Sequence, residues 1–229
     1  MSAKARPTAE RANGDAAWKL PRGRHKLPEK VVAENQRSRL LAATARTLAR
    51  RGYTALVVED IIKEAGVSRT TFYANFENKH DCVRIAHEEV FTRLTSHIYR
   101  ACASRLDWPR RVAAAVRAGI DFAAESPEEA RLLLFESLGA DPQLAAHVLA
   151  SNDHLVGLLR GGREHSAQAM ALPDLTERAL IGAITSIAGN RLMQGQIDRL
   201  RDLEPELVQL MLTPYVGAEE ARRIAGTEV

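Results

Sequence analysis

Cysteines are scarce in this chain, and their placement argues against a protein held together by disulfides. The two that occur, Cys82 and Cys102, fall in one predicted helix. The helical segment between them is about 30 Å long, which is far beyond disulfide reach. No intrachain bridge is expected, which suits a reducing compartment. Each thiol is expected to be a small buried apolar group, with an intermolecular or sensor role as the alternative.

Long apolar runs are also missing. No stretch approaches the roughly 18 to 20 apolar residues that cross a bilayer, and the N-terminal residues lack the apolar segment of a secretory signal. We therefore expect a cytoplasmic protein. Aromatic residues make up only 5% of the chain, whereas strong helix formers such as Ala, Leu, Arg and Glu dominate. With no strand pattern and no internal repeat, the composition favours an all-α fold.

Catalytic and cofactor motifs are absent as well. The chain has no G-x-S-x-G, Walker, G-x-G-x-x-G, H-E-x-x-H or C-x-x-C pattern. Adjacent carboxylates such as Glu88-Glu89 point about 100° apart on a helix, so they suit solvated faces better than acid–base pairs. His147 and His154 lie seven apart, whereas metal-binding helices usually space their ligands by three or four. Surface or core histidines are expected there, with a metal site as the alternative, and neither an enzyme nor a cofactor is predicted.

Positive charge is concentrated at the N-terminus. Residues 1–30 hold eight Lys or Arg against three Asp or Glu, a surplus of five that exceeds the net charge of +3 of the whole chain. A polar basic arm ahead of a folded domain often follows a nucleic-acid backbone. A solvated disordered tail explains the same composition, so the arm alone does not decide the function.

One segment carries a helix-turn-helix pattern. Apolar residues recur at helical spacing over Val58–Ala65, which makes one apolar face. Gly66 suits a tight turn because it lacks a Cβ, and Ser68 can cap a following helix. Phe72 and Phe76 are placed to pack that second helix against the first. The polar residues between them remain free for phosphates and base edges.

Further helices are predicted on both sides of this motif, from apolar residues that recur every three or four positions. Gly52 is expected to end the first of them, and Gly161-Gly162 is expected to kink a long one. The predicted ranges are 29–51, 79–104, 107–125, 127–138, 143–171, 175–197, 205 to about 217, and 219–225.

The motif and its flanks resemble the DNA-binding domain of the TetR (tetracycline-repressor) family. The resemblance covers about residues 33–82 and rests on Gly52-Tyr53, Ile61, Ala65-Gly66-Val67-Ser68, Phe72-Tyr73, Phe76 and Lys79. It implies an all-α protein whose N-terminal helix-turn-helix DNA-binding domain is followed by a helical ligand-binding and dimerisation domain. We accordingly predict a disordered basic arm (1–30), a DNA-binding domain (31–80) and a ligand-binding and dimerisation domain (81–229).

The resemblance also implies which residues contact DNA. The second helix of the motif would lie in the major groove, where Arg69 would read a guanine edge or touch only phosphate. Tyr73 would donate its hydroxyl to a phosphate, Lys79 would bind phosphate at a helix start, and the arm would enter the minor groove. The predicted DNA-binding residues are Thr54, Ser68, Arg69, Thr70, Thr71, Tyr73, Asn75, Lys79 and His80, with Arg22, Arg24 and Lys26 from the arm.

Two positions depart from the family pattern. Val57 stands where Ser or Thr often caps the second helix and bonds phosphate. Valine can do neither, although Thr54 could partly substitute. Cys82 stands where a larger aliphatic residue is usual. Looser packing is therefore expected at the start of the helix that follows the motif.

Aromatic residues beyond the motif could line a pocket for a small apolar or amphipathic ligand, because such pockets are mostly apolar with few polar anchors. Core packing explains the same residues equally well. The predicted ligand-binding residues are Phe91, Trp108, Phe122, Phe135 and His154.

A row of small residues on the predicted helix 175–197 favours close approach of another helix. Two copies of this helix and of the last long helix could form a four-helix dimer interface, or the row could serve packing within one chain. The predicted dimerisation residues are Gly182, Ile184, Ser186, Ile187, Gly189, Leu207, Leu210 and Met211.

These patterns together predict a ligand-responsive transcriptional regulator, most simply a repressor that binds a palindromic DNA operator as a homodimer. Half-sites would lie about 34 to 36 Å apart, and a small molecule would release the DNA by shifting the population of dimers. Two alternatives remain. One is an all-α small-molecule-binding protein or enzyme with an incidental helix-turn-helix, and the other is a non-specific DNA-binding protein.

Overall fold

The computed structural model describes residues 28–103, 107–134 and 142–227, and every regular element in these ranges is a helix. The prediction of an all-α fold is confirmed. The elements are α1 (Glu29–Ala55), α2 (Val58–Ala65), α3 (Arg69–Asn75), α4 (Lys79–Cys102), α5 (Trp108–Glu125), α6 (Pro127–Leu134), α7 (Pro142–Arg160), the 3-10 helix η1 (Gly161–His165), α8 (Ala167–Met170), α9 (Thr176–Met193), the 3-10 helices η2 (Ile197–Arg199) and η3 (Arg201–Leu203), α10 (Glu204–Val216) and α11 (Ala218–Ala225).

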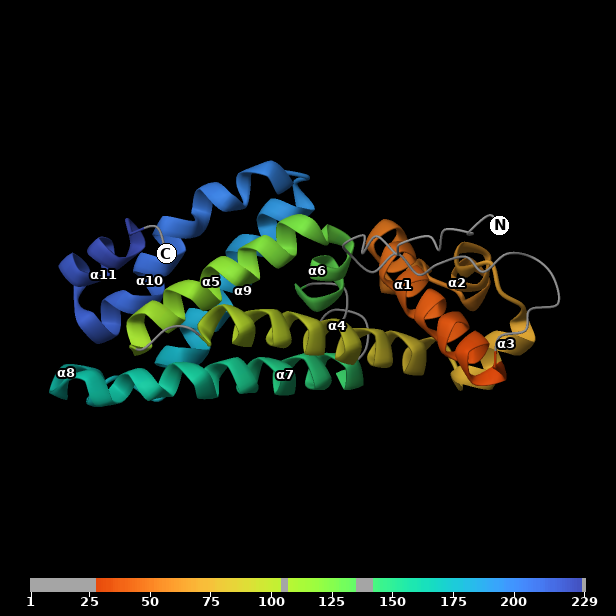
Figure 1. Cartoon of the computed structure of the whole chain (residues 1–229), viewed down its shortest axis with the longest axis horizontal. Coiled ribbons are helices and arrows are strands. Elements are labelled where there is room, and N and C mark those ends of the chain that lie inside the picture. The colour runs from red at the N-terminus through yellow and green to blue at the C-terminus, as the bar shows by residue number, and fades with distance from the viewer. Residues whose placement is uncertain (1–27, 104–106, 135–141, 228–229) are drawn as a thin grey trace, which may run out of the picture.

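The helices gather into two groups that share one long element. Figure 1 shows α1–α3 at one end of the molecule and the C-terminal helices at the other, with α4 passing from the first group into the second. The short helix α6 lies at the junction. Four of the predicted contact residues fall outside the described ranges, namely Arg22, Arg24, Lys26 and Phe135.

Polar side chains cap several of the helices, and the cap predicted at Ser68 is present. The Ser68 hydroxyl accepts a hydrogen bond at 3.0 Å from an amide in the first turn of α3, and the side chains of Asn78 and Asp107 do the same for α4 and α5. Val57 supplies no such cap to α2, as expected. The Asp60 carboxylate instead accepts from the Val57 N–H at 3.3 Å, so only half of a capping box is present.

Two glycines shape the chain around the helix-turn-helix. Gly66 ends α2 at a φ of 63°, in the left-handed region that side chains disfavour. Gly52 lies within α1 at a φ of 72°, yet one further helical turn follows it to Ala55. The predicted helix end at Gly52 is therefore a kink, and the Leu56 amide still bonds the Gly52 carbonyl at 3.2 Å.

The prediction of one helix over 143–171 is wrong. The α-helix stops at Arg160, and the tighter turns of η1 take over at Gly161-Gly162, where a kink was predicted. At this point the Trp108 ring packs directly on Gly162. A Cβ at Gly162 would lie 2.4 Å from two ring carbons, so this close approach requires glycine. The α9 helix also ends at Met193, before the predicted end at 197.

Buried apolar side chains form two clusters. The C-terminal core cluster draws on α5–α11 and includes Trp108, Leu180, Met211 and Tyr215. The N-terminal core cluster underlies the helix-turn-helix and is completed by side chains of α6 and α7. Its members are Leu40, Leu41, Ala43, Ala45, Leu48, Leu56, Ile61, Ala65, Phe72, Phe76, Cys82, Val83, Ala86, Val90, Leu132, Leu133 and Leu144. The helix-turn-helix therefore shares its core with helices that come much later in the chain.

One carboxylate is fully buried in the C-terminal half. Glu177, in the first turn of α9, accepts two hydrogen bonds from the Arg163 guanidinium, at 2.7 and 2.9 Å, and a third from the Tyr215 hydroxyl at 3.2 Å. The Arg163 bonds above all hold the pKa of Glu177 below its usual value. This bidentate fork ties η1, α9 and α10 together.

Replacing Glu177 by Gln should lower the free energy of unfolding at neutral pH by about 1.5–3 kcal/mol, because hydrogen bonds to charged groups contribute about that much. The contribution of ionised Glu177 is present above its ordinary pKa of 4.5 and is lost as the pH falls through the lower folded value. The two proteins should therefore converge in stability at acidic pH.

Urea unfolding across a pH series measures this difference. Glu220→Gln is the matched control, since it breaks an exposed ion pair with Arg223 and should change stability little. If the loss of unfolding free energy in Glu177→Gln stays constant down to low pH, the stabilisation does not depend on the ionised carboxylate.

Candidate DNA-binding surface and internal cavity

The outer face of α3 is a small polar surface held in place by buried aromatic rings. Phe72 and Phe76 are buried, with ring centroids 5.6 Å apart, and anchor the helix to the N-terminal core cluster. Arg69, Thr70 and Tyr73 are exposed on the opposite side. Because Tyr73 follows Arg69 by four positions and Thr70 by three, the three side chains lie on the same face of the helix.

Arg69 carries the positive charge of this face and is held on it by two neighbours. Its guanidinium lies 2.9 Å from the Glu59 carboxylate and 5.9 Å from the centroid of the Tyr73 ring. A hydrogen bond with Tyr73, and then the Glu59 charge, raise the pKa of Arg69, so it stays cationic. The pair with Glu59 is exposed and screened by solvent, so the guanidinium can exchange it for a phosphate or a base edge.

The other predicted residues of α3 are engaged within the motif. The Thr71 hydroxyl lies 2.8 Å from the Ser68 hydroxyl, and the Asn75 amide donates to the Thr71 carbonyl at 2.8 Å. These bonds stabilise the ends of α3. Thr54, in the last turn of α1, is exposed beside the motif.

Lys79 points toward the end of α1. Its ammonium donates to the Tyr53 carbonyl at 3.0 Å and lies 4.4 Å from the centroid of the Tyr53 ring. The bond ties the turn after the Gly52 kink to the start of α4. His80, the next residue, is half-buried. A DNA phosphate at Lys79 would have to share the ammonium with Tyr53.

Several arginines of α1, which were not among the predicted residues, position the motif. Arg39 donates to the carbonyls of Ala65 and Gly66, in the turn itself, the second at 3.0 Å. Arg46 and Arg50 both bond Glu64 of α2, at 2.8 and 2.6 Å. The partners lie 14 to 27 residues apart in the chain, so no spacing rule within one helix could reveal them.

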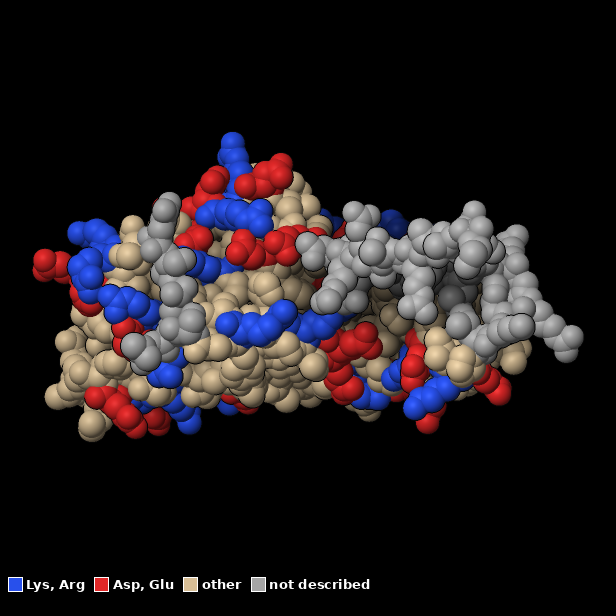
Figure 2. Space-filling model, in the orientation of Figure 1, with Lys and Arg blue, Asp and Glu red and all other residues tan. Residues whose placement is uncertain are grey.

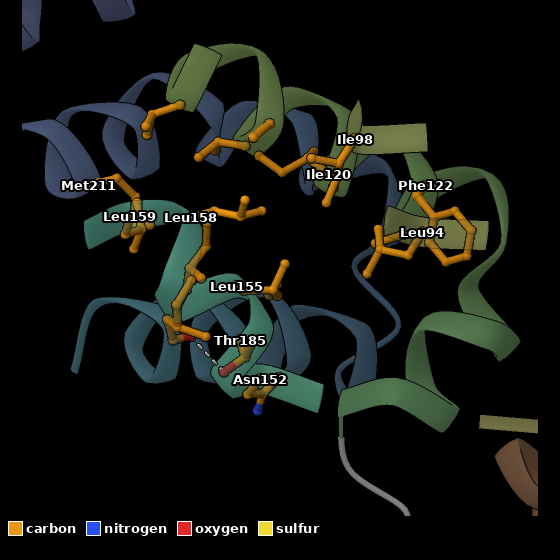
Figure 3. A pocket seen from close by; sticks show the side chains of 18 of the residues that line it. Leu94, Ile98, Ile120, Phe122, Asn152, Leu155, Leu158, Leu159, Thr185 and Met211 are labelled. Carbon is orange, nitrogen blue, oxygen red and sulfur yellow. Dashed lines mark hydrogen bonds between the residues drawn. The ribbon is translucent and has the colours of Figure 1, made fainter. Parts of the chain in front are cut away.

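A cavity of about 690 Å³ lies among the helices of the C-terminal half. Figure 3 shows side chains from several helices pointing into it, among them Leu94 and Ile98 of α4, Ile120 of α5 and Leu155 of α7. Its polar lining is sparse, with Asn152 and Thr185 lying near one another on one side (Figure 3). Such a wall suits a ligand that is mostly hydrocarbon.

Three of the predicted pocket residues line this cavity, namely Phe91, Trp108 and Phe122. His154 does not; its Nε2 lies 2.9 Å from the Tyr99 hydroxyl, and Tyr99 is a lining residue. Leu94 and Ile98 were predicted only as part of an apolar helical stripe. That stripe identified the inward face of α4, but the sequence contained no sign that the face borders a cavity instead of packed side chains.

The cavity has an exposed end and a closed end. Tyr99, Arg111 and Leu158 line the end that lies farther from the helix-turn-helix, and all three are exposed. His87, nearer the helix-turn-helix, is buried. Burial above all, and then the neighbouring His147, lower the pKa of His87 to about 4, so its ring is neutral at physiological pH. The lining of α4 from His87 to Ala103 extends over about 24 Å at 1.5 Å per residue.

Arg131 of α6 links the two halves of the molecule. Its guanidinium donates to the Ala49 carbonyl of α1 at 3.3 Å and to the Leu192 carbonyl of α9 at 2.7 Å. On the same short helix, Leu133 lines the cavity and also belongs to the N-terminal core cluster. The α6 helix thus contacts the cavity, the helix-turn-helix core and α9 at once.

The predicted dimerisation residues divide by burial. Gly182, Ser186, Ile187 and Leu210 are exposed, Ile184 lines the cavity, and Gly189, Leu207 and Met211 are buried within the chain. Leu175 and Met193, at the two ends of α9, are exposed apolar residues that the sequence analysis did not select. The exposed row on α9 is therefore the part of this set that faces away from the core.

Charge elsewhere is mixed. On the face shown in Figure 2, acidic and basic side chains are interspersed over the helical body and do not separate into one large patch. Within the described ranges, no group of three or more His, Cys, Asp or Glu is arranged to hold a metal ion. No helix there is long and apolar enough to cross a bilayer.

Comparison with known proteins identifies the helix-turn-helix. Residues 40–84 match the family described as bacterial regulatory proteins, tetR family. The HTH-type transcriptional activator FasR of Mycolicibacterium smegmatis is 29% identical over 135 residues, which are 59% of this chain and 62% of that protein. The match thus spans less than two thirds of the relative's length.

Two solved structures share the fold. One is the fatty acid degradation regulator FadR from Bacillus halodurans, with a TM-score of 0.69 and 22% identity over 77% of this chain and 94% of that one. The other is FadR from Bacillus subtilis in complex with stearoyl-CoA, with a TM-score of 0.67 and 20% identity over 78% of this chain and 97% of that one.

Replacing Lys79 by Gln should destabilise the protein by about 1–2 kcal/mol, because a hydrogen bond and a cation–π contact with Tyr53 are lost together. Thermal unfolding measures this loss. Lys63→Gln, on the exposed side of α2, is the control and should change stability little. Equal stability of the two variants would show that the Tyr53 contact does not hold α1 to α4.

Proposed function

Because the chain belongs to the tetR family of bacterial regulatory proteins, we propose that it is a ligand-responsive, DNA-binding transcriptional regulator. The observation that carries this proposal is that one residue belongs both to the cavity lining and to the core beneath the helix-turn-helix. Leu133 lines the cavity and also belongs to the N-terminal core cluster beneath the helix-turn-helix. A molecule in the cavity would touch a side chain that supports the DNA-binding helices, and close packing prevents such a side chain from moving alone.

In this proposal, residues 31–80 bind DNA, and residues 81–229 bind the ligand and a second subunit. The exposed face of α3 enters the major groove, where Arg69 and Thr70 meet base edges and Tyr73 meets a phosphate. Thr54, Ser68, Thr71, Asn75, Lys79 and His80 border that face. Figure 2 supports this assignment. On the side of the molecule that it shows, acidic and basic side chains are interspersed over the helical body, so no large basic patch there competes for DNA.

A homodimer would supply the second recognition helix. The exposed row of α9 offers Gly182 and Ser186, where a partner helix can approach closely, with Leu175 and Met193 at its ends. A two-fold axis through this row would make the interface self-complementary. The two α3 helices would then meet half-sites of a palindromic operator about 34 to 36 Å apart.

For the ligand, we propose a long acyl chain with an anionic head group. The apolar wall would take up the chain, each buried methylene contributing about 0.8 kcal/mol. Arg111 is the one Lys or Arg among the described lining residues, and it lies at the exposed end, where a head group would remain in water. The stearoyl-CoA complex of Bacillus subtilis FadR supports acyl-CoA thioesters as the first probes.

The ligand would act on DNA binding through α6. A chain that displaces Leu133 would also shift Arg131, whose two hydrogen bonds connect α1 to α9. A change at the subunit interface and a change at the helix-turn-helix would therefore occur together. Allosteric coupling of this kind requires two states that the ligand binds unequally.

We propose that the unliganded dimer binds the operator, so that the protein is a repressor released by its ligand. The related FasR is named an activator, which makes activation the second candidate. A reporter gene whose promoter overlaps the operator separates the two. Expression that rises on deletion of the regulator supports repression, and expression that falls supports activation.

Replacing Arg69 by Ala should weaken operator binding about tenfold and relax the base preference at one position of each half-site, because Arg69 is assigned to a base edge. Tyr73→Phe should weaken binding across all sequences, since it removes a phosphate contact, and should relax the base preference less than Arg69→Ala, since it also removes the hydrogen bond with Arg69. Sequencing of DNA fragments selected by each variant, followed by titrations at two salt concentrations, measures both effects.

Arg223→Ala, on α11 far from the motif in sequence, is the control and should leave selection unchanged. If Arg69→Ala retains the full base preference, its base-reading role is wrong. Equal affinity of the unmodified protein for operator and random duplexes would instead favour a non-specific DNA-binding protein.

Replacing Arg131 by Ala should uncouple the two halves. Ligand affinity and operator affinity, each measured alone, should stay within about twofold of the unmodified protein. The factor by which ligand weakens operator binding should fall at least about fivefold, because couplings of this kind typically amount to 5- to 150-fold.

The matched control is Arg201→Ala, which breaks a pair with Asp121 that stays within the C-terminal half. It should preserve the coupling factor. Full coupling in Arg131→Ala would show that the signal passes elsewhere.

A further inference from the structure

The closed end of the cavity contains a polar group that the proposed acyl ligand does not use. His87 lines the cavity, is almost fully buried, and its Nδ1 has no hydrogen-bond partner among the described residues. The Phe91 ring lies parallel to the imidazole, 7° from coplanar, with centroids 6.3 Å apart. The His147 ring meets it edge-on at 5.0 Å. Both rings restrict the orientation of the His87 side chain.

An unpaired nitrogen at this depth is costly, because it has lost its bonds to water and gained none in return. Most buried polar groups in folded proteins have a partner, so an exception calls for an explanation. Of the two rings packed on His87, Phe91 is apolar and His147 meets it edge-on, and the cavity lining along α4 continues with Leu94 and Ile98. The group best placed to pair with the imidazole is therefore one that a ligand brings in.

We propose that His87 is a specificity-determining residue that hydrogen-bonds a hydroxyl or keto group near the far end of the ligand's acyl chain. The inference rests on the proposed function, since it takes the acyl chain to enter with its head group at Arg111. The lining from Ala103 to His87 runs along α4 for about 24 Å, so only a long chain reaches both ends.

The chemistry at His87 selects a neutral polar group over a charged one. Burial keeps the imidazole uncharged, with a pKa of about 4. A neutral imidazole offers one N–H donor and one acceptor nitrogen, which matches a hydroxyl or a ketone. A second carboxylate at this end would have to be buried without a cation, because Arg111 lies at the opposite end. The ligand class is thus an acyl chain oxidised near its tail.

Paired probes that differ by one oxygen test this inference. The probes are 16-hydroxyhexadecanoic acid and hexadecanoic acid, each as the free acid and as the CoA thioester, with hexadecanedioic acid as the charged comparison. Calorimetric titration of the full-length protein should give about five- to tenfold tighter binding of the hydroxylated probe. The dicarboxylic acid should bind no better than hexadecanoic acid.

Variants at His87 test whether the preference for the hydroxylated probe depends on a nitrogen of the imidazole ring. His87→Phe keeps a ring of similar shape and should abolish the preference, while binding hexadecanoic acid at least as well as before. His87→Gln keeps hydrogen-bonding groups and should retain part of the preference. His97→Phe makes the same chemical change at a histidine outside the cavity lining and should leave the ratio of the two affinities unchanged.

The outcomes separate this inference from the proposed function. Equal affinities for the two probes, or a preference that survives in His87→Phe, would overturn the role of His87 alone. Failure of every acyl probe to bind the unmodified protein would overturn the acyl ligand class and this inference with it. Operator binding, measured in parallel, would remain as the test of the regulator itself.

Discussion

The packing of Leu132, Leu133 and Leu144 into the core formed with α1 and α4, which support the helix-turn-helix, is the contact on which the rest of the structure depends. These side chains come from α6 and α7, yet they complete the N-terminal core cluster. Without these leucines, part of the cluster would be exposed to water. The remaining domain of about fifty residues is too small to bury that apolar surface by itself. The DNA-binding helices and the cavity are therefore two sides of one packed region, and a change on one side must be accommodated on the other.

Polar contacts then determine which parts of the candidate DNA-binding surface are rigid. Arg39 holds the turn, and Arg46 with Arg50 holds α2 through Glu64. Lys79 fixes the end of α1 through Tyr53. Arg69 differs from them, because its partner Glu59 is as exposed as itself. The bonds of Arg39 to Ala65, of Arg46 to Glu64 and of Lys79 to Tyr53 are partly buried. The side chain assigned to base edges instead keeps a partner that water already weakens.

Much of the fold follows from local sequence signals. The helical spacing, the caps at Ser68, Asn78 and Asp107, and the turn at Gly66 each depend on residues within a few positions of one another, and all are present. The site was only partly predictable. Arg131 bonds a residue 82 positions away, so it has no local signal. The Gly161-Gly162 pair did signal a break after Arg160, but the packing of Trp108 on Gly162 did not follow from local spacing. A stripe of apolar residues on α4 looks the same whether it borders packed atoms or a cavity.

The shared core also has a consequence for how the protein opens. Segments that complete one another's packing tend to unfold as one cooperative unit, and amide hydrogen exchange reports such units directly. Amides of α1 should then exchange at rates that follow those of α6, although α6 lies far along the chain. Removing the C-terminal helices would not release an independent DNA-binding module, because the piece left behind would lack Leu132, Leu133 and Leu144. In this chain, the boundary between the proposed DNA-binding part and the proposed ligand-binding part does not divide the folding unit.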